Sequence, residues 1–235
     1  MSIRLESIFN EKISQGITLD NPNCKIISIE GIDGSGKTTL VDNCVEELRR
    51  RGYRAEHFYT ASEFNRYWNV IKKMSKFEKR VISDDVNQVL HNVAFLTYVD
   101  SILIDMQNRN DFVVTEWYLY GKMVLSDLYT GTEDSMSKRM LEEYLKNGKI
   151  KEPDYSFYLD ITPEESLRRI EQRNAERESK ESYDMLCRAQ KIWQGYIEKF
   201  GITRVDATKT PQELTNEVVG KILLPKEVEA EDFEL

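Results

Sequence analysis

A run of glycines ends in a lysine and a threonine in the segment Gly31-Ile32-Asp33-Gly34-Ser35-Gly36-Lys37-Thr38. These residues match the phosphate-loop pattern G-x-x-x-x-G-K-[ST] at every fixed position. Glycines let backbone N–H groups turn toward phosphate oxygens, and a helix that begins at the loop adds the positive end of its dipole. We therefore expect Gly31 to Thr39 to bind ATP, with Lys37 at the β- and γ-phosphates and Thr38 as a ligand of Mg²⁺.

Five short apolar runs, rich in β-branched or aromatic residues, indicate the strands that must position this loop. They are Lys25–Glu30, Tyr53–Tyr59, Phe112–Glu116, Tyr155–Ile161 and Ile202–Asp206. Helical patterns separate them, and strands that are apolar almost throughout are typical of parallel sheets covered on both faces. The sequence therefore predicts an α/β fold, a doubly wound parallel five-stranded sheet flanked by helices.

Cap signals mark where several of these helices begin or end. Ser83 precedes a long helical pattern, and Thr162-Pro163 with Glu165 offers an N-cap, a proline at the first position and a capping-box acid. Thr210-Pro211 opens the last helix in the same way, and Gly52 is a C-cap candidate. These signals predict helix boundaries between the strands.

Charge and composition limit the possible partners. The chain has 235 residues, with 33 lysines and arginines against 41 aspartates and glutamates, a net charge of −8. So acidic a chain lacks the broad basic surface that a nucleic-acid backbone requires. It has no run of about 18 apolar residues and no signal-peptide core. We therefore expect a cytoplasmic protein with neither a membrane nor a nucleic acid as its partner.

The three cysteines, Cys24, Cys44 and Cys187, are odd in number and far apart, which favours reduced thiols. With only two histidines, a Cys/His zinc cluster is not expected.

Three parts are expected along the chain: an N-terminal extension over residues 1–24, a phosphate-loop kinase domain over 25–224, and an acidic mobile tail over 225–235.

Several motifs resemble those of thymidylate kinases. Ile29–Thr39 resembles the phosphate loop of that family, including its acidic residue at Asp33. Pro153–Arg173 is similar to the family's fourth strand and the helix leading into its lid, and Val205–Thr208 resembles the loop that frames adenine. The resemblance covers about residues 25–224 and implies a nucleotide kinase that uses ATP and Mg²⁺.

The resemblance also implies where arginines neutralise the transferring phosphoryl group. In that family they lie either beside the acid of the phosphate loop or in the lid. Here Gly34 follows Asp33, so the lid arrangement is implied, with Arg173 and Arg177 in a lid around residues 173–182. The planar fork of arginine suits phosphate oxygens. The alternative is a solvated helix end held by Glu–Arg pairs.

The acceptor side departs from the family. Where it usually has Asp-Arg-Tyr at the end of the third strand, this chain has Glu116-Trp117-Tyr118. The carboxylate survives as Glu116, at a strand end where α/β sites form, but the arginine that holds the acceptor's phosphate is now Trp117. Deoxynucleoside kinases also place a glutamate here, as base for a sugar hydroxyl, although arginine follows it there too. Glu116 is thus expected as a catalytic base or magnesium-shell acid, or else as a plain strand-end carboxylate.

Four residues are candidates for contact with the acceptor: Asp33, Tyr98, Trp117 and Tyr118. Asp33 would by resemblance place a sugar hydroxyl, and its alternative role is to bond the backbone of its own loop. The aromatic residues could stack on a base or simply fill the core. Four basic residues could replace the missing phosphate clamp or form a solvated helix face: Arg66, Lys72, Lys73 and Arg80.

Three hypotheses follow for the activity. The first is transfer of the γ-phosphoryl group of MgATP to a nucleoside monophosphate, dTMP or a related nucleotide. The second is a deoxynucleoside-kinase-like enzyme that phosphorylates a hydroxyl acceptor, and the third is a non-catalytic switch that binds ATP. Thymidylate kinases are commonly dimers packed through helices. The apolar stretch Phe95–Ile104 could serve a homodimer in this way or belong to the core.

Overall fold

The computed structural model describes residues 21–60, 70, 83–173 and 182–224. Predictions made for the first 20 residues, for most of the lid at 174–181, for Arg66, Lys72, Lys73 and Arg80, and for the tail at 225–235 lie outside the described residues. They therefore stay predictions.

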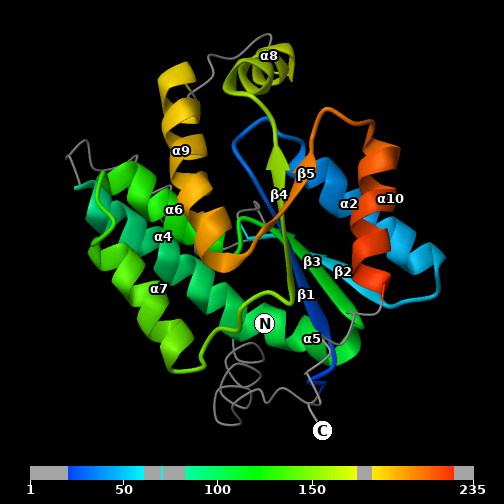
Figure 1. Cartoon of the computed structure of the whole chain (residues 1–235). Helices are drawn as coiled ribbons and strands as arrows, with labels where there is room; N and C mark the ends of the chain where they lie inside the picture. The colour runs from blue at the N-terminus through cyan, green and yellow to red at the C-terminus, as the bar shows by residue number, and fades with distance from the viewer. Residues whose placement is uncertain (1–20, 61–69, 71–82, 174–181, 225–235) are drawn as a thin grey trace, which may run out of the picture.

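A single parallel sheet of five strands, in the order β2-β3-β1-β4-β5, forms the centre of the molecule (Figure 1). Its strands are β1 (Lys25–Glu30), β2 (Ala55–Phe58), β3 (Phe112–Glu116), β4 (Tyr155–Asp160) and β5 (Thr203–Asp206). The predicted fold class is confirmed, and all five strands lie within the apolar runs that predicted them. Because the strands are parallel, the carboxyl ends of β1, β3 and β4 lie at one edge of the sheet, with β1 as the central strand between β3 and β4.

Three strands, the two outer ones and β4, are shorter than predicted. β2 begins at Ala55 rather than Tyr53, because the backbone N–H of Arg54 donates to the Asp111 carboxylate at 2.8 Å and so leaves the ladder. β5 begins at Thr203, and β4 ends at Asp160. Apolar composition alone does not reveal such side-chain competition for backbone groups.

Helices cover both faces of the sheet (Figure 1). On one face lie α2 (Lys37–Arg50) and α10 (Pro211–Leu223), which pack on each other. On the other lie α4 (Asp84–Tyr98), α6 (Leu119–Thr130), α7 (Met136–Lys146) and α9 (Tyr183–Phe200), while α8 (Pro163–Arg173) follows β4 at the carboxyl edge of the sheet. The predicted caps are confirmed at Ser83, which accepts from the Val86 N–H, and at Thr210, where both halves of a capping box form. At Thr162 only half of the box forms, because the Glu165 carboxylate binds Arg168 and Arg169 instead.

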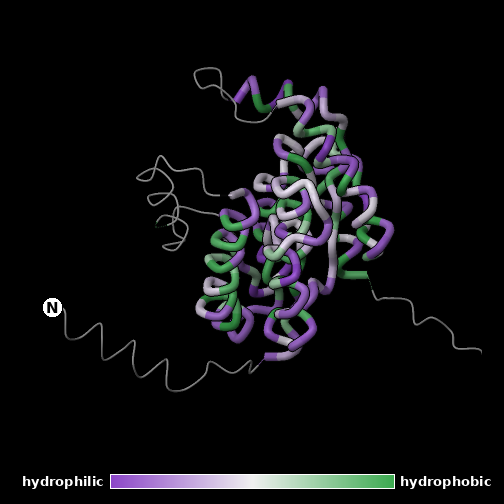
Figure 2. Tube along the Cα trace, turned by 90° about the vertical axis from the view of Figure 1, so that its left-hand side faces the viewer, coloured by the Kyte–Doolittle hydropathy of each residue, from purple (hydrophilic) through white to green (hydrophobic). Residues whose placement is uncertain are grey.

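One long helical stretch is apolar over much of its length. α4, the π-helical turn η1 (Val99–Leu103) and α5 (Ile104–Arg109) join into 26 residues that are long and apolar enough, by length and composition only, to cross a membrane. Figure 2 shows apolar residues along much of this stretch. In the fold, however, α4 packs against α6 and α7, and Phe95, Val99 and Leu103 are buried in the core. The buried residues of Phe95–Ile104 therefore belong to the core, and a role of this stretch in a homodimer stays a prediction.

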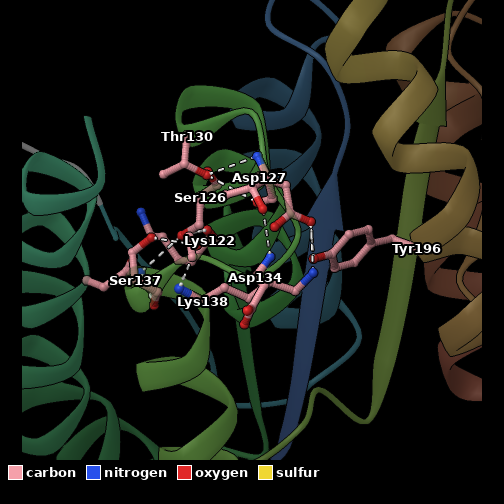
Figure 3. Close-up of polar contacts among 11 residues, drawn as sticks. Lys122, Ser126, Asp127, Thr130, Asp134, Ser137, Lys138 and Tyr196 are labelled. Carbon is pink, nitrogen blue, oxygen red and sulfur yellow. Dashed lines mark hydrogen bonds and ion pairs between the residues drawn. The ribbon is translucent and has the colours of Figure 1, made fainter. Parts of the chain in front are cut away.

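A buried ion pair ties three helices of this face together (Figure 3). The Lys138 ammonium on α7 lies 2.9 Å from the Asp127 carboxylate on α6, and the Tyr196 hydroxyl on α9 donates to the same carboxylate at 2.8 Å. All three side chains are buried. The contacts fix α6, and with it the residues that follow β3, against the rest of the helical layer.

Candidate active site

The phosphate loop connects β1 to α2 and depends on three glycines with positive φ. Gly36, at φ 99°, is the N-cap of α2, and no side chain caps the helix, which leaves its first N–H groups free for an anion. Gly34, at φ 80°, packs so closely on α8 that a Cβ there would lie 2.6 Å from the Ser166 carbonyl oxygen. The Ser166 hydroxyl in turn donates to the Asp33 carbonyl. Packing against α8 thus holds Gly34 and Asp33 in place, in a loop whose conformation suits an anion.

Lys37 lies within the loop. Its ammonium donates to the carbonyls of Gly31 at 3.0 Å and Ile32 at 2.7 Å, and it lies 3.8 Å from the Asp33 carboxylate. The side chain is 5% exposed. An ammonium held in this way is placed over the concave side of the loop, where β- and γ-phosphate oxygens would replace the carbonyls as its partners.

Thr38 and Glu116 meet across the sheet's carboxyl edge. The Thr38 hydroxyl lies 3.0 and 2.9 Å from the two carboxylate oxygens of Glu116. A hydroxyl and a carboxylate at hydrogen-bond distance are the hard oxygen donors that Mg²⁺ prefers, in a site that would be completed by water and phosphate oxygens. The two residues predicted as metal ligands are therefore adjacent, and their chemistry fits the ion.

Trp117 has a backbone conformation that the sequence could not foretell. At φ 52° it is the only non-glycine residue with positive φ in the described part of the chain. This conformation carries strain that surrounding contacts must offset. It places the indole ring under the Lys37 ammonium, 4.5 Å from the ring centroid, in a cation–π contact. The residue in the arginine position of the resembling motif thus lies beside the phosphate loop.

The other acceptor-side candidates do not gather at one place. Tyr98 stacks on Phe58 with ring centroids 5.3 Å apart and lines a hollow of about 700 Å³ between α2, β2 and α4–α5, to which neither Glu116 nor Trp117 contributes. Tyr118 is fully buried, its hydroxyl donates to the Lys151 carbonyl at 3.0 Å, and burial raises its pKa. Tyr118 is therefore a core residue, the second of the two roles considered for the aromatic candidates.

Of the two lid arginines, Arg173 is the last residue of α8 and is exposed, while Arg177 lies outside the described residues. Arg169, one turn earlier, is a residue that the sequence analysis did not single out. Its guanidinium donates to the Ala207 carbonyl at 3.1 Å and lies 3.5 Å from the Ser35 carbonyl. It therefore joins the phosphate loop to the loop after β5 that resembles an adenine-framing segment.

Two further charged residues near this edge were also missed. Glu30, the last residue of β1, is fully buried, and burial raises the pKa of its carboxyl to about 7. Lys122 on α6 is buried as well, and burial lowers the pKa of its ammonium to about 8, against the attraction of Glu30 and Glu116. The available signal was a lone lysine within the otherwise apolar or uncharged segment Leu119–Leu125.

Comparison with known proteins gives one consistent family. The family model described as "Thymidylate kinase" matches residues 29–218. A thymidylate kinase of Leptospira borgpetersenii is 30% identical over 198 residues, covering 81% of this chain and 89% of that protein. A thymidylate kinase of a Thermoanaerobacter species is 28% identical, covering 74% and 82%. A probable thymidylate kinase of Archaeoglobus fulgidus is 26% identical, covering 82% and 92%.

Proposed function

This chain belongs to the thymidylate kinase family and is a nucleotide kinase, and from that premise we propose that it transfers the γ-phosphoryl group of ATP to thymidine monophosphate. The observation that supports the proposal most directly is the contact of Thr38 with Glu116 beside Lys37, within a phosphate loop that matches the pattern at every fixed position. This arrangement provides both a triphosphate cradle and a carboxylate on the acceptor side of it.

Each residue has a defined task in this proposal. The loop N–H groups and Lys37 bind the β- and γ-phosphates, since the lysine can exchange the carbonyls of Gly31 and Ile32 for phosphate oxygens. Thr38 and Glu116 would hold Mg²⁺, which supplies charge neutralisation at the phosphates when it is bound. Arg173 and Arg177 are proposed to neutralise the transferring group from the lid, and Asp33 to orient the acceptor.

A second candidate activity rests on Trp117. An indole cannot form the bidentate pair with a phosphate that a guanidinium forms, and the Glu116 carboxylate beside it could accept a proton from a hydroxyl. These two features favour a nucleoside as acceptor. The loss of one phosphate contact leaves the triphosphate side of the site intact, so the two activities differ only in what binds near Glu116 and Trp117.

Further features remain proposals. We propose a cytoplasmic enzyme whose partners are ATP and a small nucleotide, with neither a membrane nor a nucleic acid among them. A homodimer is proposed only by analogy with thymidylate kinases in general. The domain division proposed is an extension over 1–24, the kinase domain over 25–224 with its lid around 173–182, and the tail over 225–235.

The experiment that tests the function is coupled ADP release with MgATP across a panel of nucleoside monophosphates and their nucleosides. We expect turnover with thymidine monophosphate and none with thymidine. Lys37→Ala, which removes the ammonium from the loop, is expected to lower kcat by about 10³-fold. Turnover with nucleosides alone would replace the proposal by the second candidate.

A further inference from the structure

A monophosphate acceptor brings a second polyanion up to the γ-phosphate of ATP. At neutral pH the acceptor phosphate carries between one and two negative charges, and the Glu116 carboxylate already lies at this point. Without a cation on the acceptor side, like-charge repulsion would oppose binding. The proposed function therefore requires a positive group near Glu116 that is not committed to ATP.

The described cations close to the phosphate loop are engaged elsewhere. Lys37 lies inside the loop, on the carbonyls that ATP would displace. Arg169 binds Glu165, the Ala207 carbonyl and the Ser35 carbonyl on the α8 side. Neither is placed to bind an acceptor on the β3 side of the loop.

Lys122 has the required position. It lies on α6, the helix that follows Glu116 and Trp117, and its backbone N–H donates to the Tyr118 carbonyl in the first turn. Its ammonium lies 5.4 Å from the Phe95 ring centroid and is attracted by both Glu30 and Glu116. Among the described residues, neither a hydrogen bond nor an ion pair within 4.0 Å to this ammonium is found.

Close packing explains why the lysine is brought there. Gly121, the preceding residue, has no room for a side chain, since a Cβ would lie 2.5 Å from the Glu30 carboxylate and 3.0 Å from the Trp117 ring. The first turn of α6 is thereby held against the carboxyl ends of β1 and β3. One oxygen of the Glu30 carboxylate has no hydrogen-bond partner among the described residues.

We propose that the ammonium of Lys122 binds the phosphate of the nucleotide acceptor, taking the place that an arginine at position 117 would have. This inference rests on the proposed function, because it assumes that the acceptor carries a phosphate. A buried ammonium without a hydrogen-bonded anion is unfavourable in the free protein. A dianionic phosphate entering beside it would supply the missing partner.

The test is equilibrium binding, which does not depend on turnover. Calorimetry would measure the dissociation constants of thymidine monophosphate and thymidine, each in the presence of MgADP, for the wild-type chain and for Lys122→Met. We expect the variant to bind the monophosphate at least about tenfold more weakly and thymidine unchanged, as loss of one charge-assisted contact predicts. Lys146→Met, at an exposed lysine on α7, is the matched control and is expected to change neither constant.

Two results would overturn the inference. If Lys122→Met weakens thymidine binding as much as monophosphate binding, the lysine contacts the sugar or base, or supports the fold. If the wild-type chain binds the monophosphate no better than thymidine, it has no acceptor-phosphate site at all. Lys122→Arg is expected to keep the preference for the monophosphate, which a purely steric role of the lysine would not predict.

Failure of the proposed function gives a different pattern. A wild-type chain that binds the monophosphate better than thymidine, loses this preference in Lys122→Met, and still shows no turnover would support the lysine and refute the kinase activity on that acceptor. Turnover of the monophosphate with no effect of Lys122→Met on its binding or its KM would support the function and refute the lysine.

Discussion

At the scale of single residues, Trp117 distinguishes this chain from the motif it resembles, and Lys122 lies close to it in the sequence. The tryptophan stands where a phosphate-binding arginine is expected, in a strained conformation at φ 52°, and the lysine lies on the helix that follows. The positive charge that an arginine at position 117 would carry is thus found five residues later, on Lys122. This exchange explains how the acceptor side can change its sequence while the triphosphate side keeps its pattern.

The exchange predicts a rescue. In Lys122→Met, restoring an arginine with a second substitution, Trp117→Arg, is expected to recover most of the lost affinity for thymidine monophosphate, because a guanidinium binds phosphate in a bidentate way. The KM for the monophosphate in the single and double variants checks this. An unchanged or higher KM in the double variant would show that position 117 does not face the acceptor phosphate.

Lys122 also predicts a pH dependence of stability. Burial lowers the pKa of its ammonium to about 8 from an ordinary value of 10.5. Between these values the unfolded chain holds a proton that the folded chain has lost, so stability rises with pH over this window. Below pH 8 the charged, buried lysine lowers stability.

Glu30 has the opposite pH dependence. Burial raises the pKa of its carboxyl to about 7 from 4.5, so the contribution of Glu30 to the free energy of unfolding falls as pH rises between those two values.

Replacing the lysine by methionine removes the first of these terms. We expect Lys122→Met to raise the free energy of unfolding at pH 7 by on the order of 1 to 3 kcal/mol. The variant should also lack the increase in the free energy of unfolding that Lys122 gives the wild-type chain between pH 8 and 10.5. Denaturant unfolding at a series of pH values measures both, with Lys146→Met as control. A variant less stable than wild type at pH 7 would contradict this account of the lysine. A gain in stability with a loss of acceptor binding would mark a residue kept for function.

How much of the site the sequence could reveal depends on the residue. The roles proposed for Lys37 and Thr38 follow from spacing alone, because the phosphate loop is a local structure. The φ of Trp117 and the burial of Tyr118 follow from packing between β3 and α6, which no local pattern encodes. Lys122 was detectable as a lysine among apolar neighbours, but its proximity to Glu30 and Glu116 needs the tertiary fold.

At the scale of elements, the strands were predictable and some helices were not. Continuous apolar runs identify strands buried on both faces, and β1 and β3 have the predicted bounds. The sequence pattern did not predict α6, because nine of its 12 residues are buried. The helix therefore lacks the one-sided apolar pattern that marks a surface helix. The helix that carries Lys122 is therefore one that periodicity describes poorly.

The buried pair of Lys138 and Asp127 tests how α6 is held in place. Lys138→Met leaves the Asp127 carboxylate buried with the Tyr196 hydroxyl as its one hydrogen-bond partner within the described part of the chain. Breaking such a pair is expected to lower the free energy of unfolding by about 3 to 5 kcal/mol. Denaturant unfolding measures this loss. The two buried lysines of this helical layer thus have opposite expected effects on stability, and equal effects would refute the distinction between them.

At the scale of the whole molecule, the strand order β2-β3-β1-β4-β5 explains why residues far apart in sequence meet. β1 and β3 are neighbours, so the phosphate loop after β1 and the Glu116-Trp117 segment after β3 lie at the same edge. The sequence predicted the strands and their parallel arrangement but not this order. Only the order places Glu116 within reach of Thr38.

The central claim is that this site phosphorylates a nucleotide rather than a nucleoside. The most direct measurement is the ratio of kcat/KM for thymidine monophosphate to that for thymidine, with MgATP as donor and Lys37→Ala as the inactive control. The account predicts turnover of the monophosphate with no detectable turnover of thymidine. Turnover of thymidine with none of the monophosphate would contradict it and would assign Glu116 the role of general base for a hydroxyl acceptor.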